Sequence, residues 1–345
     1  MRFAHWCHRA SLLPLLGRVR DWRGEQLRIL AYHRVLDVEG RDEDFPFDLD
    51  LVSAGSRAFA DQMRFLRNHY QPLRLGDLPE LIDKGRGLPR RAVVVTFDDG
   101  YDDNYRIAFP ILRELGIPAT FFVCSGFIES GLPFTYDWLV HMLLTAPVTR
   151  VELPEIGYSA AVPHEHGSRR ALAANVLQRL KDLDAITQEA IIARLARDWN
   201  MPRNSPVPLC RPMSWAQLRE MRDAGMEIAS HGVNHHMLAK LPLAQMRDEL
   251  VRSRDMLAAG LGTPPTSLAY PVGGASAYSP AVIDAARDAG YRLACTYIHG
   301  TNRWPPGNPY RLRRIAVERA VDQPWFAASL AVPEWFSYSS PDWAN

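Results

Sequence analysis

Two adjacent carboxylates lie where a predicted strand ends. The run 92–95 (Ala-Val-Val-Val) is apolar and β-branched, which indicates a buried parallel strand. Asp98 and Asp99 follow this strand, and Gly100 breaks the chain directly after them. A buried carboxylate pair is unfavourable unless it binds a metal, shares a proton or contacts a cation. Asp-Asp-Gly is also ordinary turn chemistry, but the fully apolar strand in front of it favours a functional site.

Two histidines follow a second predicted strand, 226–230. The spacing of His231 and His235 lets both imidazoles reach one metal ion. A carboxylate from another segment would complete a three-ligand set with open positions for water, as in catalytic zinc sites. A lone His-x-x-x-His is weak support, but its place at a strand end is where α/β barrels assemble active sites. His236 is the reserve ligand if the loop favours the longer spacing.

A third candidate, His33, ends the strand-like run 27–32. An isolated histidine of this kind is best interpreted as a half-buried side chain bonded to backbone. The combination of three sites at strand ends favours a functional role instead.

Together these residues resemble the polysaccharide deacetylases of carbohydrate esterase family 4. The segments 96–100 (Thr-Phe-Asp-Asp-Gly) and 230–235 (Ser-His-Gly-Val-Asn-His) look like the first two family motifs. The third motif is usually Arg-Pro-Pro-aromatic-Gly, and 269–273 (Ala-Tyr-Pro-Val-Gly) resembles a divergent form of it. The segment 32–35 (Tyr-His-Arg-Val) is similar to the opening of the permuted branch, which includes biofilm poly-N-acetylglucosamine deacetylases. The resemblance covers roughly residues 27–320.

This resemblance implies metal-dependent removal of N-acetyl groups from amino sugars of a glycan. Asp99, His231 and His235 would hold a divalent metal, and the mixed nitrogen and oxygen ligands favour zinc. Asp98 would be the general base on water. The family assigns these two aspartate roles, because spacing alone does not distinguish Asp98 from Asp99.

The resemblance also implies an acid and an oxyanion site. His33 would protonate the leaving amine, since the acid of the permuted branch comes from its N-terminal strand. Tyr270, Pro271 and Val272 would line the substrate and oxyanion site, with a backbone N–H near Val272.

Several positions depart from the family pattern. Ala269 replaces the arginine that orients the catalytic aspartate, and Arg313 or Arg314 could supply that charge instead. Gly232 replaces the usual serine or threonine between the two histidines, which predicts the loss of one supporting hydrogen bond. The late Leu-x-His motif is not found, and His299 is the nearest substitute.

Three alternatives to N-deacetylation stay open at this stage. The first is deformylation of a lipid-linked amino sugar, and the second is O-deacetylation by the same metal chemistry. The third is a catalytically inactive glycan-binding relative, for which Ala269 is the best support.

Composition narrows the partners. The 345 residues contain 40 Lys+Arg and 39 Asp+Glu, a net charge of +1. This balance argues against a nucleic-acid partner and fits a neutral glycan substrate. The cysteines form no Cys-x-x-Cys pair, and Cys124 and Cys295 lie in or beside apolar runs, which suits reduced core residues and a cytoplasmic location.

The N-terminal segment 1–26 is predicted to be a lead-in to the fold. Its apolar patch, 12–16, is short and interrupted by proline, and no cleavage site follows, so it is a poor signal peptide. No run of 18 apolar residues is present, which excludes a spanning helix. An amphipathic lead-in helix is the main prediction, with weak peripheral contact to the inner face of the membrane as the alternative.

Strand and helix patterns alternate along the rest of the chain. This alternation predicts parallel strands with right-handed crossovers, an α/β fold in the form of a distorted (β/α)7 barrel over 27–330. Strands are predicted at 27–33, 92–97, 119–123, 226–230, 267–270, 291–297 and 312–317, and helices at 57–69, 104–115, 214–225, 243–259 and 279–289.

One region breaks this rhythm. Residues 134–212 are predicted to be a mostly helical insertion, because 169–199 has helical periodicity and prolines bound it. The insertion is either a wall over the site or a structural cap. The aromatic C-terminal tail, 331–345, is predicted to pack or to contact sugar rings.

Overall fold

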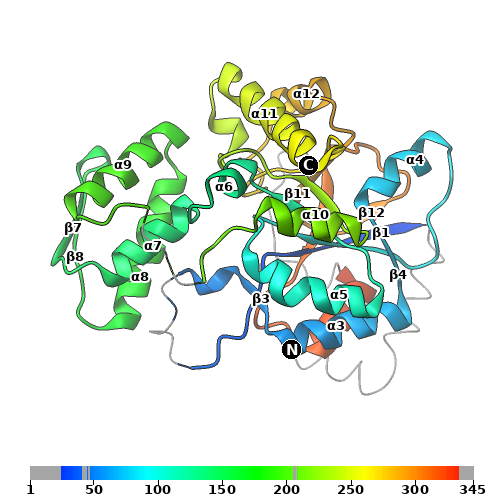
Figure 1. Ribbon diagram of the computed structural model, residues 1–345, viewed down its shortest axis with the longest axis horizontal. Helices are drawn as coiled ribbons and strands as arrows, with labels where there is room; N and C mark the ends of the chain where they lie inside the picture. Colours follow the sequence, from blue (N-terminus) through cyan, green and yellow to red (C-terminus); the bar gives the residue numbers. More distant parts are fainter. Residues whose placement is uncertain (1–24, 41–44, 46, 205–206, 208, 334–345) are drawn as a thin grey trace. The chain divides into compact units, whose positions relative to one another are not determined.

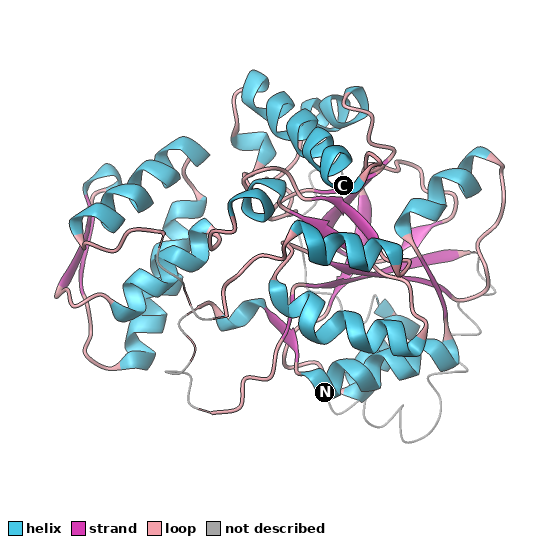
Figure 2. Ribbon diagram, in the orientation of Figure 1, coloured by secondary structure: helices cyan, strands magenta, loops and turns pink. Residues whose placement is uncertain are grey.

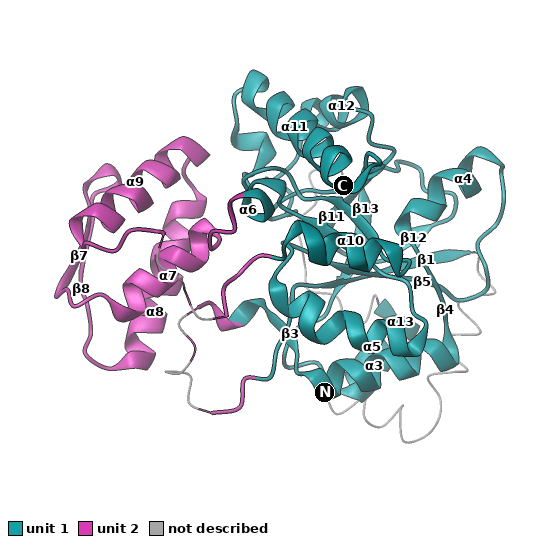
Figure 3. Cartoon of the chain, viewed as in Figure 1, with its two compact units in different colours: residues 1–37, 50–129, 213–345 teal, residues 38–49, 130–212 magenta. Residues whose placement is uncertain are grey.

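The computed structural model describes residues 25–40, 45, 47–204, 207 and 209–333 (Figure 1). The chain divides into two compact units (Figure 3). Unit 1 spans 1–37, 50–129 and 213–345, and unit 2 spans 38–49 and 130–212. Most of the predicted lead-in, 1–26, and most of the tail, 331–345, fall outside the described residues. No described helix is long and apolar enough to cross a membrane.

Unit 1 contains a closed barrel, formed within the described residues by seven parallel strands. They follow the ring order β1-β13-β11-β10-β9-β6-β5, and pairing of β5 with β1 closes the ring. Helices lie around these strands (Figure 2). This confirms the predicted (β/α)7 class. The strands are β1 (Gln26–Tyr32), β5 (Ala92–Phe97), β6 (Thr120–Val123), β9 (Glu227–Ser230), β10 (Ser267–Ala269), β11 (Leu293–His299) and β13 (Leu312–Ala316).

The inside of the barrel is apolar. Along β1, Leu27 and Ile29 belong to one buried cluster, and Leu30 and Tyr32 belong to another, as strand alternation requires. The first cluster takes side chains from every strand of the ring, so it fills the interior. Each fully buried side chain of this kind contributes about 1.5–3 kcal/mol. A filled interior leaves the ends of the strands as the place for a site.

The barrel is splayed at the start of its strands. β5 pairs with β4 (Gln71–Leu73) through Ala92–Val94 and with β6 through Thr96–Phe97. A short antiparallel strand, β12 (Asn302–Arg303), likewise pairs with the start of β1. The sequence analysis did not predict these additions. Two more short strands pair beside the barrel, β2 (Arg34–Val35) and β3 (Val52–Ala54).

The predicted helices of unit 1 are present, with their end signals. Ser214 forms a capping box with Gln217, and Gly290 follows the helix that was predicted to stop there, in the left-handed region. The α-helices are α3 (Ser56–His69), α4 (Leu78–Asp83), α5 (Phe109–Leu115), α6 (Ser125–Ser130), α10 (Trp215–Asp223), α11 (Leu243–Leu261), α12 (Pro280–Asp288) and α13 (Gln323–Ala331), with 3-10 turns at Leu49–Leu51, Leu75–Asp77 and Leu238–Lys240.

The helix predicted over 104–115 begins with a π-helical turn, η4 (Asn104–Ala108). Pro110 lies in the first turn of α5, where its missing N–H is tolerated. Gly116, with φ 64°, ends the helix as predicted. The proline therefore coincides with a change of helix type rather than with a break.

Unit 2 is mostly helical, as predicted for the insertion. The single helical pattern over 169–199 is two helices, because Asp184 caps the second by accepting a hydrogen bond from Thr187 N. Unit 2 also includes 38–49, where the backbone oxygens of Phe45 and Phe47 accept hydrogen bonds from Arg170. Its elements are α7 (Thr135–Thr145), β7 (Arg150–Leu153), β8 (Tyr158–Ala161), α8 (His166–Lys181), α9 (Ala185–Asp198) and a 3-10 turn at Pro154–Ile156.

Candidate metal and catalytic site

The predicted site residues lie at one end of the barrel. Asp98 and Asp99 follow β5, His231 follows β9, and His33 follows β1. Because all these strands are parallel, their carboxyl ends meet at the same barrel mouth. Backbone bonds fix the meeting: Asp98 N donates to Tyr32 O at 2.9 Å.

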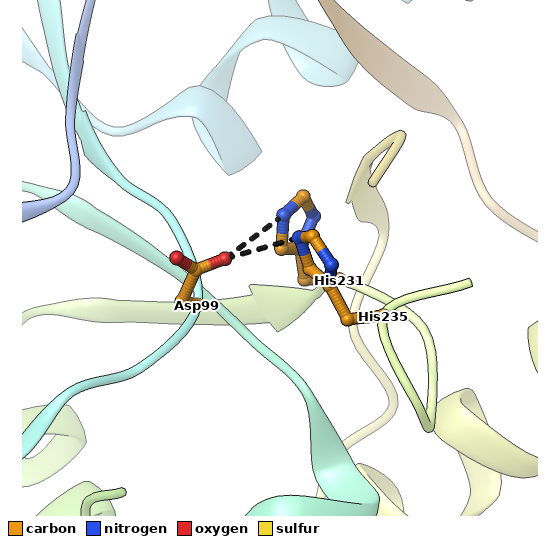
Figure 4. Close-up of side chains that lie close together, drawn as sticks. All are labelled: Asp99, His231 and His235. Atoms are coloured by element: carbon orange, nitrogen blue, oxygen red, sulfur yellow. Dashed lines mark ion pairs between the residues drawn. The ribbon is translucent and has the colours of Figure 1, made fainter. Parts of the chain in front are cut away.

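Asp99, His231 and His235 form a compact group of candidate metal ligands. Figure 4 shows both imidazole rings facing the Asp99 carboxylate. Asp99 Oδ1 lies 3.4 Å from His231 Nε2 and 3.3 Å from His235 Nε2, and one ligand atom from each residue falls within 4.8 Å of the others. The three residues that the sequence assigned to one metal are therefore brought together.

The orientation of His231 is set by a hydrogen bond on its far side. Its Nδ1 lies 2.8 Å from the backbone oxygen of Ala269 and donates to it. This bond leaves Nε2, the atom that faces Asp99, free of its proton and able to bind a metal. The alanine that replaces the family arginine thus holds a ligand through its backbone.

The charges of the group favour a cation. Burial raises the pKa of Asp99, but His231 and His235 lower it more, so this pKa lies well below its usual range. Burial lowers the pKa of His231, but Asp99 and Asp98 raise it above its ordinary value. Asp99 Oδ1 is buried and accepts no hydrogen bond within the part of the chain that the structure describes. Two imidazole nitrogens and this oxygen fit a divalent metal such as zinc.

The backbone around the site is strained. Asp99, His235 and Val272 have φ of 74°, 59° and 65°, in the left-handed region that non-glycine residues rarely adopt. Val272 is β-branched, which makes its conformation the least expected. Such strain costs on the order of 1–3 kcal/mol per residue and concentrates at functional sites.

Asp98 does not belong to this group and contacts an arginine. Arg314 NH1 and NH2 each lie 2.7 Å from one oxygen of Asp98, a bidentate pair with both side chains buried. Burial raises the pKa of Asp98, but Arg314 opposes it and the net pKa is lowered. Of the two arginines considered from the sequence, Arg314 contacts Asp98. Along β13, Arg314 is buried and its neighbour Arg313 is half-buried.

His33 lies beside Asp98. Its Nε2 is 4.0 Å from Asp98 Oδ2, and 19% of its side chain is exposed. Its ring packs against Tyr297, with the centroids 5.4 Å apart. His33 therefore lies within reach of both Asp98 and the solvent at the barrel mouth.

Comparison with known proteins agrees with this geometry. The family model described as polysaccharide deacetylase matches residues 85–294, more than half of the chain. The chain belongs to the polysaccharide deacetylase family. A poly-beta-1,6-N-acetyl-D-glucosamine N-deacetylase of Escherichia coli K12 is 33% identical over 128 residues, 35% of this chain. The chain spans 18% of that relative's length.

Solved structures of deacetylases share the fold. The Streptococcus pyogenes deacetylase PplD in complex with acetate matches with a TM-score of 0.60 and 19% identity, over 90% of this chain and all (100%) of that one. IcaB from Ammonifex degensii matches with a TM-score of 0.56 and 21% identity, over 89% of this chain and 97% of that one. At these identities the likeness shows the fold.

Two residues of this deacetylase-family chain have a role that the sequence analysis missed. Asp103, interpreted as a helix-start residue, is buried and accepts hydrogen bonds from Arg34 Nε at 2.8 Å and Val35 N at 3.2 Å. Asn104 Nδ2 donates to the backbone oxygen of His33 at 2.8 Å. Together they fix the segment that presents His33. A buried charge needs a partner, and Arg34 next to His33 was the available signal.

The remaining predicted residues divide by exposure. Tyr270 is fully buried, and its hydroxyl donates to Tyr310 O at 3.0 Å, so its side chain supports the core. Pro271 is buried, whereas Val272 is 37% exposed. His236 Nδ1 lies 3.4 Å from Glu249, outside the ligand group, and His299 ends β11. Val272 is therefore the member of 270–272 that is placed to contact substrate.

Proposed function

We propose that this chain hydrolyses N-acetyl groups on amino sugars of a glycan. The observation that carries the proposal is the ligand group Asp99, His231 and His235 next to the paired Asp98 and Arg314. The name of the Escherichia coli relative supports an N-acetylglucosamine polymer as the substrate class.

Asp99, His231 and His235 would hold the metal, for which zinc is our proposal. When bound, a divalent metal would polarise the amide carbonyl and lower the pKa of a water molecule. The Ala269 carbonyl holds His231 in the required tautomer.

Asp98 is proposed as the general base. Arg314 keeps its carboxylate ionised and fixes both oxygens, although a lowered pKa also weakens a base. The benefit is orientation, since a misplaced base cannot reach the proton of the attacking water.

His33 is proposed as the general acid on the leaving amine, because it stands on a different strand end from Asp99 and within 4.0 Å of Asp98. The backbone N–H of Val272 is proposed as a donor to the developing oxyanion. Its left-handed φ of 65° supports this role, since strain of this kind is retained where orientation matters.

The test is acetate release from a panel of N-acetylated oligosaccharides by the full chain, with and without a chelator. Release that stops with the chelator and returns with zinc supports the proposal. Formate release or O-acetyl hydrolysis alone would replace it with one of the alternatives. Absence of release from every substrate would favour the inactive relative, whose main support, Ala269, is weakened by the Arg314–Asp98 pair.

A cytoplasmic location, and weak contact with the membrane through the N-terminal segment, stay predictions. Fractionation of cells that express the full chain, followed by a salt wash of the membranes, tests both.

A further inference from the structure

The loop that carries the two histidines rests on a buried carboxylate of α11. Glu249 is 6% exposed. Its Oε2 accepts hydrogen bonds from Val233 N at 2.8 Å and Asn234 N at 3.1 Å. Its Oε1 accepts from Asn234 Nδ2 at 2.6 Å and lies 3.4 Å from His236 Nδ1. All these partners belong to the segment between and just after His231 and His235.

Ser253, one helical turn further along α11, holds the start of the same loop. Its Oγ donates to Gly232 O at 3.0 Å and lies 2.8 Å from Ser230 Oγ. Ser230 Oγ in turn accepts a hydrogen bond from Gly232 N at 3.2 Å. Residues four apart share one face of a helix, so Glu249 and Ser253 act on the loop together.

The loop needs such support because its backbone is unfavourable. Gly232 has φ 80° and His235 has φ 59°. A non-glycine residue in this region costs on the order of 1–2 kcal/mol. Hydrogen bonds to a carboxylate are roughly twice as strong as neutral ones, so Glu249 can offset that cost.

We propose that Glu249 and Ser253 are positioning residues that hold the His231–His235 loop in its metal-binding conformation, in place of the side chain that Gly232 lacks. This inference rests on the metal site of the proposed function.

Gly232 gives the inference a sharp consequence. A Cβ atom at this position would lie 3.3 Å from Glu249 Oε2, and φ there is already in the left-handed region. A side chain at residue 232 would therefore displace the carboxylate. Restoring the usual family residue by Gly232→Ser should weaken metal binding instead of improving it.

The experiment measures zinc affinity of the full chain by competition with a chromophoric chelator, without substrate. Glu249→Gln keeps the volume but turns an amide N–H₂ toward loop donors, so we expect roughly tenfold weaker zinc binding. Ser253→Ala and Gly232→Ser should also weaken it. Asp248→Ala is the matched control, because Asp248 is the neighbouring residue on α11, is 56% exposed and pairs with Arg252.

The visible spectrum of the cobalt-substituted protein provides a second readout, since a displaced His235 alters the ligand geometry. A changed spectrum in Glu249→Gln, with Asp248→Ala like wild type, supports positioning. Zinc affinity equal to wild type in both Glu249→Gln and Ser253→Ala overturns the proposal, as does tighter binding by Gly232→Ser.

The two proposals can fail separately. A wild-type protein that binds zinc but releases no acetate would contradict the proposed function, while weaker zinc binding by the Glu249 variant would still support positioning. Acetate release by wild type, together with full zinc affinity in the variants, would contradict positioning alone.

Discussion

Two acidic side chains at opposite ends of the barrel show how differently burial can be resolved. Glu227 begins β9, and its carboxylate accepts hydrogen bonds from three neutral donors, Gly76 N at 2.7 Å, Thr120 Oγ1 at 2.7 Å and Ser267 Oγ at 3.0 Å. Burial raises its pKa despite these bonds. Asp99, at the other end, has a lowered pKa because imidazoles outweigh its burial.

The difference teaches that neutral donors satisfy a carboxylate without fixing its charge. Glu227 is bonded on both oxygens and ties three segments together, whereas Asp99 Oδ1 accepts no hydrogen bond within the described residues. One end of the barrel is therefore organised for stability, and the other is organised for a positive charge.

The largest expected effect is loss of metal from the Asp99 end. Asp99→Ala and His231→Ala each remove one of three ligands and should abolish stoichiometric zinc binding and acetate release. Metal analysis after dialysis measures this. His236→Ala is the comparison variant and should keep its zinc, because His236 lies with Glu249. Full zinc content in both ligand variants would show that the metal site is elsewhere.

The next effect concerns the base. Asp98→Asn keeps the size of the side chain and removes its basicity, so kcat/KM should fall by roughly 10²–10⁴ while zinc content is unchanged. Steady-state kinetics and metal analysis of the same sample check this. Loss of zinc in Asp98→Asn would contradict the separation of the two aspartate roles.

His33→Ala should cost a similar factor, roughly 10²–10⁴, because the leaving amine loses its proton donor. An acid must be protonated to act, so the alkaline limb of the pH–rate profile should disappear in this variant. A profile that keeps full activity and an unchanged alkaline limb would make His33 a core residue, with His299 the next candidate for the acid.

Arg314→Lys should have a smaller effect with a defined sign. The bidentate guanidinium lowers the pKa of Asp98 against the effect of burial, so its loss should raise that pKa. Asp98 must be ionised to act, and the acidic limb of kcat/KM should therefore move to higher pH. Arg313→Lys, one residue earlier on β13, is the control and should keep the wild-type profile. A shift to lower pH in Arg314→Lys would refute the pairing.

The smallest effect is expected at the Glu227 end. A raised pKa in the folded state adds stability below the unfolded pKa, about 4.3, and this contribution is lost as pH rises through the folded pKa. Relative to Glu227→Gln, the unfolding free energy of wild type should therefore fall as pH increases from about 4. Chemical denaturation at several pH values measures it. A difference that does not vary with pH would argue against the raised pKa.

The sequence predicted the barrel where the pattern was strong. Strands such as Ala92–Phe97 are continuous apolar runs, and helix ends carried caps such as Ser214. β4 was missed because Gln71–Leu73 is three residues long and contains a proline, and β12 because it has only two residues. Elements this short depend on a neighbouring strand, which local sequence does not reveal.

The candidate site was predictable to the extent that it lies in contiguous motifs. Asp99, His231 and His235 lie together as their spacing indicated. Choosing between Arg313 and Arg314 required the alternation of β13 against its neighbours. Glu249 could not be identified, because its contacts with Val233 and Asn234 depend on how α11 packs in three dimensions.

The π-helical turn η4 has a consequence for how this chain tolerates insertions and deletions. An α-helix turns about 100° per residue, and a π turn accommodates one residue more than an α turn. Asp103 and Asn104 lie at its start and hold the His33 segment, while Phe109 and Leu112 beyond it are buried in the core. Deleting one residue within 105–108 would restore a regular helix but rotate the two faces apart by about 100°. The register of this one helix is therefore shared between catalysis and packing, and its length cannot vary freely in descendants of this sequence.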